Sequence, residues 1–470
     1  MSILRRFFSV DKLIEDKFVK GPLPSNKEAY STAFQMAWPS SLEMVLIGLI
    51  GSADLIMVSH LGSEAIAAAG ITTQPKFILL ALVLALNTGV TVIVSRRKGQ
   101  NRQEEANKVL MNAFFMSLII ATVMSFLGFV FARPILSLAG ASPDYLELSV
   151  VYFKIIVIGN FFTSISNTLT SAQRGAGNTK ISMITNLTAN MVNIVFNYLL
   201  IYGVGPFPQL GIMGAGIATL IGNVISFVIA FYSITNKKGD AFIKLEFSKK
   251  VKLDLSRWME LIRVSSSAFV EQIFIRGGFF VFAMVIALLG TDAFAAHQVT
   301  INILSLSFAV GEGLSIAAST LVGQNLGKLR SDLAMLYSKV LQRIGLVVSI
   351  LLASLLVIFR VEILSLFSQG NPTVLELGEP LMFIVGATVA FQILGTITIG
   401  TLRGGGDLKY TAFLMMISIG ILRPVTSYFF AISLSGGLIG AWLSILLDQV
   451  VRSMSSQKRF ASGKWLNIKI

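Results

Sequence analysis

The sequence has no cysteine and only two histidines among its 470 residues. The lack of cysteine excludes disulfide bonds and thiolate metal sites. His60 and His297 are too few for a histidine metal cluster, so no cofactor is expected. Charged residues are also scarce, at 13% of the chain, whereas an average soluble domain has about 25%. This scarcity of charge argues against a soluble domain.

Hydrophobic residues make up 54% of the chain and lie in long blocks, without helical or strand periodicity. Most blocks reach the length of about 20 residues that crosses a bilayer as a helix. We therefore predict an all-α polytopic membrane protein with twelve transmembrane helices. The expected spans are 33–58, 66–95, 109–131, 145–172, 180–202, 211–234, 258–289, 294–322, 336–359, 375–402, 410–434 and 437–454.

The spans form two predicted six-helix lobes, residues 29–236 and 258–454, joined by a charged cytoplasmic linker at 237–257. A cytoplasmic tail is expected at each end, at 1–28 and 455–470. In the first tail, apolar residues at helical spacing predict either an amphipathic helix at the membrane surface or a frayed segment. In the second tail, Trp465 is expected at the level of the lipid headgroups.

The net charge of +14 raises the question of a nucleic-acid partner, but its distribution favours a membrane. Most of the 38 Lys and Arg residues fall in the tails, the linker and alternate loops, all on one predicted side. The opposite loops 59–64, 203–211 and 433–437 contain none. This asymmetry predicts a multi-pass cell-membrane protein with both termini cytoplasmic, the lipid bilayer as a partner and no nucleic acid.

The two halves of the chain repeat each other. LGSEAIAAAG at 61–70 corresponds to LGTDAFAAHQ at 289–298, and QRGAGNTK at 173–180 corresponds to LRGGGDLK at 402–409. Because each half has an even number of spans, both have the same orientation, related by a pseudo-two-fold axis along the membrane normal. Such repeats are typical of secondary transporters, and we expect a monomer with a substrate cavity between the lobes.

Two carboxylates, Glu43 and Asp54, lie within the first predicted span. A charged side chain at the centre of a bilayer costs roughly 2.5–3.5 kcal/mol on insertion scales. Each of the two carboxylates is therefore expected to have a functional or structural role. Their separation of about three helical turns places both on one helix face. That face is expected to contact water or to pair with polar groups.

Asn193, Asn197 and Thr219 are predicted to lie at the depth of Asp54, in the outer half of the first lobe. A carboxylate, two amides and a hydroxyl can hold a sodium ion through oxygen ligands, or surround a carboxylate that takes up a proton. The alternative is polar contact between helices without a transport role. The position equivalent to Asp54 in the second half is Phe282, so the coupling site is expected in one lobe only.

Glu43 and Glu271 occupy equivalent positions in the two halves. They are expected either to face a common cavity and attract a cationic substrate, or to pair locally. Other polar residues within spans that are expected to line the pathway are Gln272, Gln298 and Gln392. Arg174 and Arg403, in the glycine-rich turns, are expected to cap helix ends or touch headgroups, and Asp448 to anchor its span at the interface.

The quoted blocks, with NxxxNY at 193–198, GIMGAGIAT at 211–219 and the run AHQVTINILSLSFAVGEGLSIAASTLVGQNLG in span 8, resemble the multidrug and toxic-compound extrusion (MATE) family. The resemblance covers the membrane region and implies two six-helix lobes that export organic cations against a proton or sodium gradient. It implies that Asp54 is the coupling aspartate, with Asn193, Asn197 and Thr219 as polar ligands, and that Glu271 is an acid of the second lobe. It also places Gln392 where one branch has an aspartate.

We therefore expect a secondary active antiporter that exports a small organic cation in exchange for H⁺ or Na⁺ by alternating access. The alternative is a flippase of lipids or lipid-linked oligosaccharides, as in related members of the superfamily. A flippase cavity is expected to be basic, whereas the residues proposed for this cavity are acidic. An enzyme is not expected, because the chain has few residues suited to catalysis.

Overall fold

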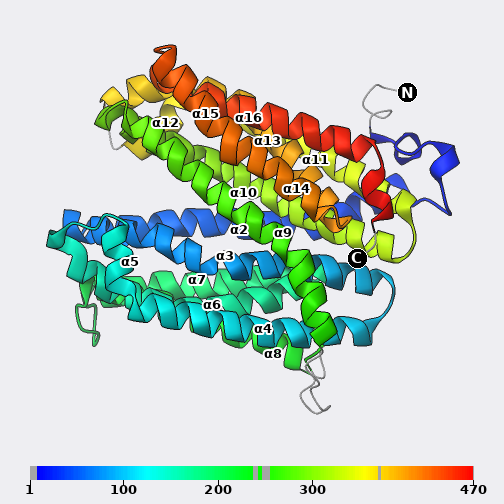
Figure 1. Cartoon of the computed structure of the whole chain (residues 1–470), viewed down its shortest axis with the longest axis horizontal. Coiled ribbons are helices and arrows are strands. Elements are labelled where there is room, and N and C mark those ends of the chain that lie inside the picture. The colour runs from blue at the N-terminus through cyan, green and yellow to red at the C-terminus, as the bar shows by residue number, and fades with distance from the viewer. Residues whose placement is uncertain (1–7, 237–241, 246–254, 369–371, 469–470) are drawn as a thin grey trace. The chain divides into compact units, whose positions relative to one another are not determined.

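The computed structural model describes residues 8–236, 242–245, 255–368 and 372–468, and the described part contains helices and no strand (Figure 1). Every predicted span has a helical counterpart. These are α2 (Asn26–Ser59), α3 (Ser63–Gly99), α4 (Gln103–Val130), α6 (Pro143–Gly175), α7 (Thr179–Tyr202), α8 (Gly211–Thr235), α9 (Leu255–Ala287), α10 (Thr291–Gly327), α11 (Ser331–Ile358), α13 (Pro372–Gly404), α14 (Leu408–Met415) with α15 (Arg423–Tyr428), and α16 (Gly437–Ala461). Most of the predicted linker lies outside the described residues.

Among the described residues, eleven helical segments are long and apolar enough to cross a membrane. The predicted last span corresponds to α16, whose 25 residues include several buried polar side chains. The eleventh predicted span contains two wider π-helical stretches, Met416–Leu422 and Phe429–Ser433, on either side of α15. Two short helices were not predicted, α5 (Ala132–Leu138) and α12 (Arg360–Ser368), and they follow corresponding spans in the two halves.

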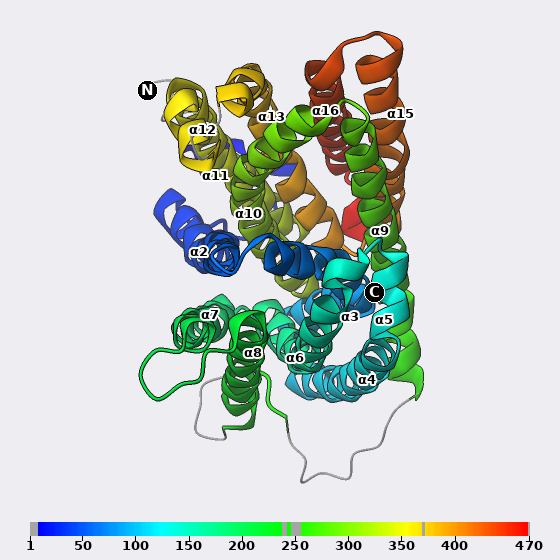
Figure 2. The same cartoon turned by 90° about the vertical axis from the view of Figure 1, so that its left-hand side faces the viewer.

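The chain divides into two compact units whose boundaries fall within α2 and α9. Unit 1 contains Met1–Met44 and Val270–Ile470, and unit 2 contains Val45–Phe269. Within unit 2, α6 packs against α3, α4 and α8; within unit 1, α13 packs against α10, α11 and α16 (Figure 2). Each unit is therefore built around one central helix, and α6 and α13 are repeat counterparts.

Glycine allows these central helices to approach their neighbours closely. A Cβ atom at Gly175 of α6 would lie 2.7 Å from the carbonyl oxygen of Thr91 in α3. At the equivalent place in unit 1, a Cβ atom at Gly404 of α13 would lie 2.3 Å from the carbonyl oxygen of Ser319 in α10. Any larger residue would push the backbones apart, because close packing between transmembrane helices requires small residues.

The repeat also extends to unusual backbone conformations. Gly62 and Gly290, which precede α3 and α10, have φ of 101° and 103°. Asn101 and Leu329, at the turns after these helices, have φ of 56° and 61°. Because non-glycine residues seldom adopt positive φ, their occurrence at matching places supports duplication independently of side-chain similarity.

The N-terminal segment differs from both sequence-based expectations. Its described part forms 3₁₀ turns at Val10–Lys12 and Asp16–Phe18, and Val10, Leu13 and Ile14 are buried in the core of unit 1. The Lys339 ammonium donates to the carbonyl oxygen of Leu13 at 2.7 Å. These residues thus pack within unit 1, as neither a surface helix nor a frayed segment.

The C-terminal segment is also packed into unit 1. Trp465 is fully buried and stacks on Phe460, with ring centroids 5.5 Å apart. Its indole N–H donates to the carbonyl oxygen of Phe460 at 3.0 Å. The expectation that Trp465 lies among headgroups was wrong, because the indole fills a space beside α16 and satisfies its donor there.

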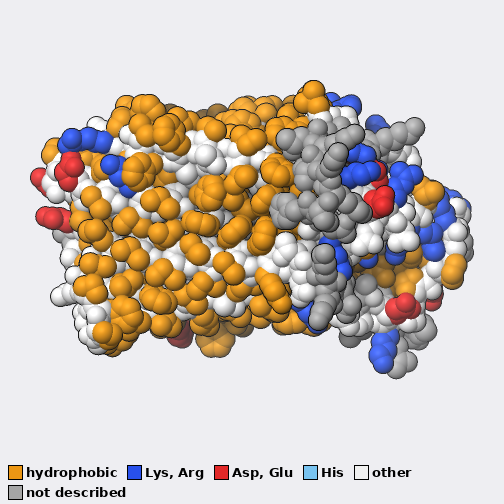
Figure 3. Space-filling view, turned by 90° about the horizontal axis from the view of Figure 1, so that it is seen from below, with side chains coloured by type: hydrophobic (Ala, Val, Ile, Leu, Met, Phe, Trp, Pro, Cys, Tyr) orange, Lys and Arg blue, Asp and Glu red, His pale blue; other side chains and the backbone are white. Residues whose placement is uncertain are grey.

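Hydrophobic side chains cover the middle of the face in Figure 3, and Lys and Arg gather toward one end. In α4, Ile119, Val123, Phe126 and Val130 are all exposed and recur at helical spacing. A large exposed apolar stripe marks an interaction surface, and on a helix of this length and hydropathy it indicates contact with lipid.

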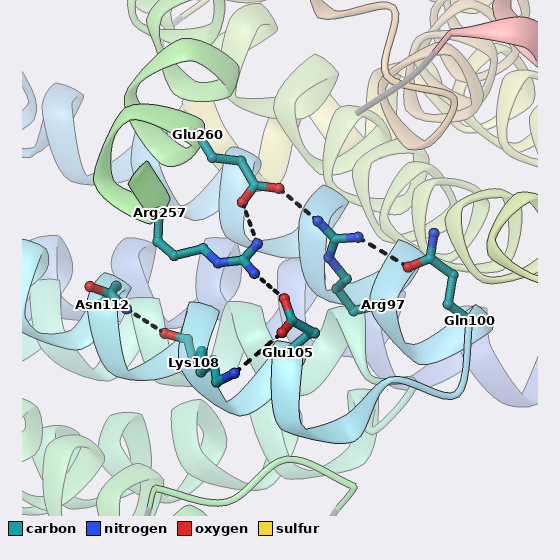
Figure 4. A network of polar contacts seen from close by, with 7 residues as sticks. All are labelled: Arg97, Gln100, Glu105, Lys108, Asn112, Arg257 and Glu260. Atoms are coloured by element: carbon teal, nitrogen blue, oxygen red, sulfur yellow. Dashed lines mark hydrogen bonds and ion pairs between the residues drawn. The ribbon is translucent and has the colours of Figure 1, made fainter. Parts of the chain in front are cut away.

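An ion-pair network within unit 2 fixes the start of α9 to α3 and α4 (Figure 4). Arg257 of α9 bonds to Glu105 of α4, and Glu260 of α9 accepts from Arg97 of α3 at 3.0 Å. The network ends with Lys108 on Glu105 and Gln100 on Arg97. Acidic and basic side chains alternate along the network, so each of the two acids contacts two basic side chains.

Replacing Gly404 with alanine tests the close contact between α13 and α10. The added methyl group would meet the backbone of Ser319, so we expect destabilisation by roughly 1–3 kcal/mol. Gly277→Ala in α9 is the matched control, since nothing lies within 4 Å of its Cβ position. Thermal unfolding in detergent measures both variants. Equal melting temperatures for the two would contradict the proposed packing.

Candidate cation-binding site

Helices α2, α7 and α8 bring four polar residues together in unit 2. Asp54 comes from α2, Asn193 and Asn197 from α7, and Thr219 from α8. Helices α7 and α8 approach closely because a Cβ atom at Gly222 would lie 2.7 Å from the carbonyl oxygen of Ala189. This contact places Thr219 beside Asn193. The structure thus brings together the four residues that the sequence grouped by depth.

The Asp54 carboxylate accepts hydrogen bonds from amide groups. The side-chain nitrogen of Asn197 donates to Oδ1 of Asp54 at 2.7 Å. Asp54 is half-buried, whereas Asn193 and Asn197 are buried. Lys76 of α3 acts on Asp54 electrostatically. The groups that donate hydrogen bonds to this carboxylate are therefore neutral, and Lys76 interacts with it electrostatically from a greater distance.

The Asn193 amide is satisfied in one orientation. With its nitrogen toward Asp54, it donates to Oδ1 at 2.9 Å and Oδ2 at 3.1 Å, and its oxygen accepts from the Thr219 hydroxyl at 3.2 Å. The reversed orientation would set the amide oxygen against both carboxylate oxygens of Asp54, acceptor against acceptor, and is therefore disfavoured.

The four residues offer oxygen atoms of the kind that can hold a sodium ion or a proton. A carboxylate, two amides and a hydroxyl are hard oxygen donors, which suit such cations. The Oδ1 atom of Asn197 is buried and has no hydrogen-bond partner. A buried acceptor of this kind is costly unless something occupies its lone pairs, and a bound cation would do so. The residue set fits a cation.

The two acids of α2 belong to different units. Glu43 lies in unit 1 and is buried, whereas Asp54 lies in unit 2. A cavity role for Glu43 stays a prediction.

Other predicted cavity residues lie in unit 1. Glu271 is buried and forms an ion pair with Arg403 at the end of α13. Gln392 is buried with its Oε1 atom unpaired, Gln272 is half-buried and Gln298 is exposed. Their lining of a substrate pathway stays a prediction.

Two ion pairs were missed in the sequence. Arg403 binds Glu271 rather than capping a helix or touching headgroups. Asp448 is completely buried and pairs with Arg423, so it does not anchor the interface. One signal was available, because the halves share an acid and an arginine at equivalent places, Glu43 with Arg174 and Glu271 with Arg403. The pairing of Asp448 had no such signal.

A duplicated bundle of apolar helices with buried polar groups is typical of membrane transporters. The chain belongs to the MatE family, whose sequence model matches residues 39–199 and 267–429. The MATE resemblance is thereby confirmed, and so is the predicted class of a multi-pass helical membrane protein.

Known proteins similar to the chain share nearly its whole length. An uncharacterized transporter, YisQ, from Bacillus subtilis is 28% identical, over 92% of this chain and 94% of the relative. A probable multidrug resistance protein NorM from Thermotoga maritima is 27% identical, over 95% and 96%. The structure of an outward-facing multidrug resistance MATE family transporter matches with a TM-score of 0.86 at 20% identity, over 92% and 96%. This match confirms the twelve-helix, two-lobe fold.

Asn197→Asp tests whether this group of residues binds cations. It would place a second carboxylate against Asp54, and two adjacent carboxylates cannot both stay ionised without a cation. We expect a lower melting temperature at pH 8 in choline chloride, restored by sodium chloride or by acid. Thermal unfolding in detergent provides the measurement.

The matched control exchanges the two groups, as Asp54→Asn with Asn197→Asp, and keeps one carboxylate. It should lose the extra cation response of the single variant. If neither the parent nor Asn197→Asp responds to sodium or acid, the four residues do not form a cation site.

Proposed function

We propose that the protein is a secondary active antiporter that exports small organic cations in exchange for H⁺ or Na⁺, with coupling at Asp54. The observation that carries the proposal is a carboxylate within a membrane helix whose donors are neutral amides. Family membership supports transport, and the name of the Thermotoga maritima relative supports multidrug export. We also propose a monomer with both termini cytoplasmic.

In the unloaded state, the carboxylate is ionised and accepts from both asparagines. The Asn193 nitrogen faces the two oxygens of Asp54, and Asn197 donates to Oδ1. Charged hydrogen bonds of this kind are stronger than neutral ones, and they offset part of the cost of a charge at this depth.

In the loaded state, a proton or sodium ion on the carboxylate would balance its charge and compete with the amide nitrogens of Asn193 and Asn197 for its oxygens. Because the Asn193 oxygen accepts from the Thr219 hydroxyl, a change at this amide would also reach α8.

Antiport follows if the loaded and unloaded forms favour different conformations. A cation shifts the equilibrium between the two only by its difference in affinity for them. Because α7 and α8 carry three of the four residues, the rearrangement on loading begins in these two helices. The organic cation would then bind preferentially to the conformation that the coupling cation disfavours.

Asp54→Asn is expected to abolish gradient-driven efflux of a cationic dye from proteoliposomes. The amide has no charge with which to bind a coupling cation, so efflux should no longer depend on the ion gradient. In linked sites, such coupling typically changes the affinity for the other ligand about 5–150-fold. Dye transport under separately imposed sodium and proton gradients provides the measurement and identifies the ion.

Asp292→Asn is the control, because this aspartate is exposed in the first turn of α10. It should transport the dye as the parent does. Unchanged efflux in Asp54→Asn would refute coupling at Asp54. A parent protein that moves a fluorescent lipid but no dye would instead support the flippase alternative.

A further inference from the structure

Unit 1 contains a buried group of charges apart from Asp54. Glu271 of α9 is 1% exposed and pairs with Arg403, which lies at the end of α13. The carboxylate of Glu312 in α10 also acts electrostatically on Arg403. In α16, Arg452 is influenced by both Glu271 and Arg403. The direct contact of Glu271 is therefore with Arg403 of α13, and Glu312 of α10 and Arg452 of α16 act on this pair at longer range.

A second acid in unit 1 is held in the same manner. Asp448 of α16 has no exposed surface and pairs with Arg423 at the start of α15. The guanidinium of Arg452, one helical turn along α16, lies 3.7 Å from the same carboxylate. These two acids, Glu271 and Asp448, thus have arginine partners supplied by unit 1 itself.

This arrangement contrasts with that of Asp54. A guanidinium stays charged under all ordinary conditions and is fixed to the chain, so it neutralises a carboxylate permanently. A coupling cation must instead bind and leave. Removing one partner of a buried pair leaves an uncompensated charge, which is strongly destabilising. Arg403 therefore occupies the position that an exchangeable cation would need at Glu271.

We infer that Arg403 is a resident counter-ion for Glu271, so that unit 1 exchanges no cation at this acid. Together with the proposed function, on which this step rests, the inference confines cation exchange to Asp54. It also assigns a specificity role to Arg403, which disfavours sodium ions and protons at Glu271 by neutralising its charge through Oε1, while Oε2 stays buried without a hydrogen-bond partner.

The test removes Arg403 in a background where Asp54 is silent. The full-length protein carrying Asp54→Asn is compared with the same protein carrying Arg403→Gln in addition, at pH 8 in choline chloride. We expect the added substitution to lower the melting temperature. Sodium chloride, or a change to acidic pH, should restore it, because a free cation then binds the vacated carboxylate.

Two further variants decide the cause of this response. Adding Glu271→Gln to the same protein should abolish the new response to sodium and acid, because no charged carboxylate remains. Arg403→Lys should stay close to the background and gain no sodium response, since an ammonium group replaces the guanidinium. This lysine variant also keeps the inference testable if Arg403→Gln does not fold.

Arg360→Gln provides the matched control. Arg360 pairs with Glu379, but their side chains are 31% and 43% exposed, so water can replace the guanidinium. It should produce no new cation dependence. The inference is overturned if Arg403→Gln and Arg360→Gln respond alike to sodium, or if the background has a sodium response that Glu271→Gln removes. This experiment measures melting temperatures and not transport. Its result can therefore be interpreted even if the proposed coupling at Asp54 is wrong.

Discussion

Backbone contact through glycine is the constraint on which both charged sites depend. Gly222 brings α8 against α7, and this contact sets Thr219 beside Asn193. Gly404 brings α13 against α10 and directly follows Arg403, so it also fixes where the guanidinium emerges. In both units, the polar chemistry is placed by apolar packing, because side chains a few ångströms long reach their partners only when the helices lie close together.

The two sites show two ways to keep an acid within a transmembrane bundle. At Asp54, neutral amides donate to the carboxylate, and under the proposed function its charge is balanced by a cation that can depart. At Glu271, a fixed guanidinium balances the charge within the protein. The first arrangement suits a charge that is balanced reversibly, and the second suits a charge that is balanced permanently. The hydrogen-bond donors around an acidic side chain therefore decide which of the two it can do. A count of buried acids in the sequence would not distinguish them.

The sequence was sufficient for features that depend on length, hydropathy and depth. It located the twelve spans and the repeat, and it grouped Asp54 with Asn193, Asn197 and Thr219, because residues at one depth on neighbouring helices tend to meet. It did not reveal the pairing of Arg403 with Glu271, since the choice of partner depends on how each helix is rotated. The packing of Val10 and Trp465 was missed for a related reason: tails have weak local preferences, and tertiary contacts decide their course.

The paired turn conformations have a consequence for how the two halves diverged. Asn101 and Leu329 share a left-handed backbone, although leucine gains nothing from it and left-handed geometry costs roughly 1–2 kcal/mol per residue. Asp54 and Phe282, also equivalent, are a carboxylate bonded to Asn197 in one copy and a buried ring beside His297 in the other. Duplication thus retained the backbone path, even where it is strained, and left the side chains free to change. The shared backbone of the turns is therefore a record of the duplication that does not depend on which side chains they carry.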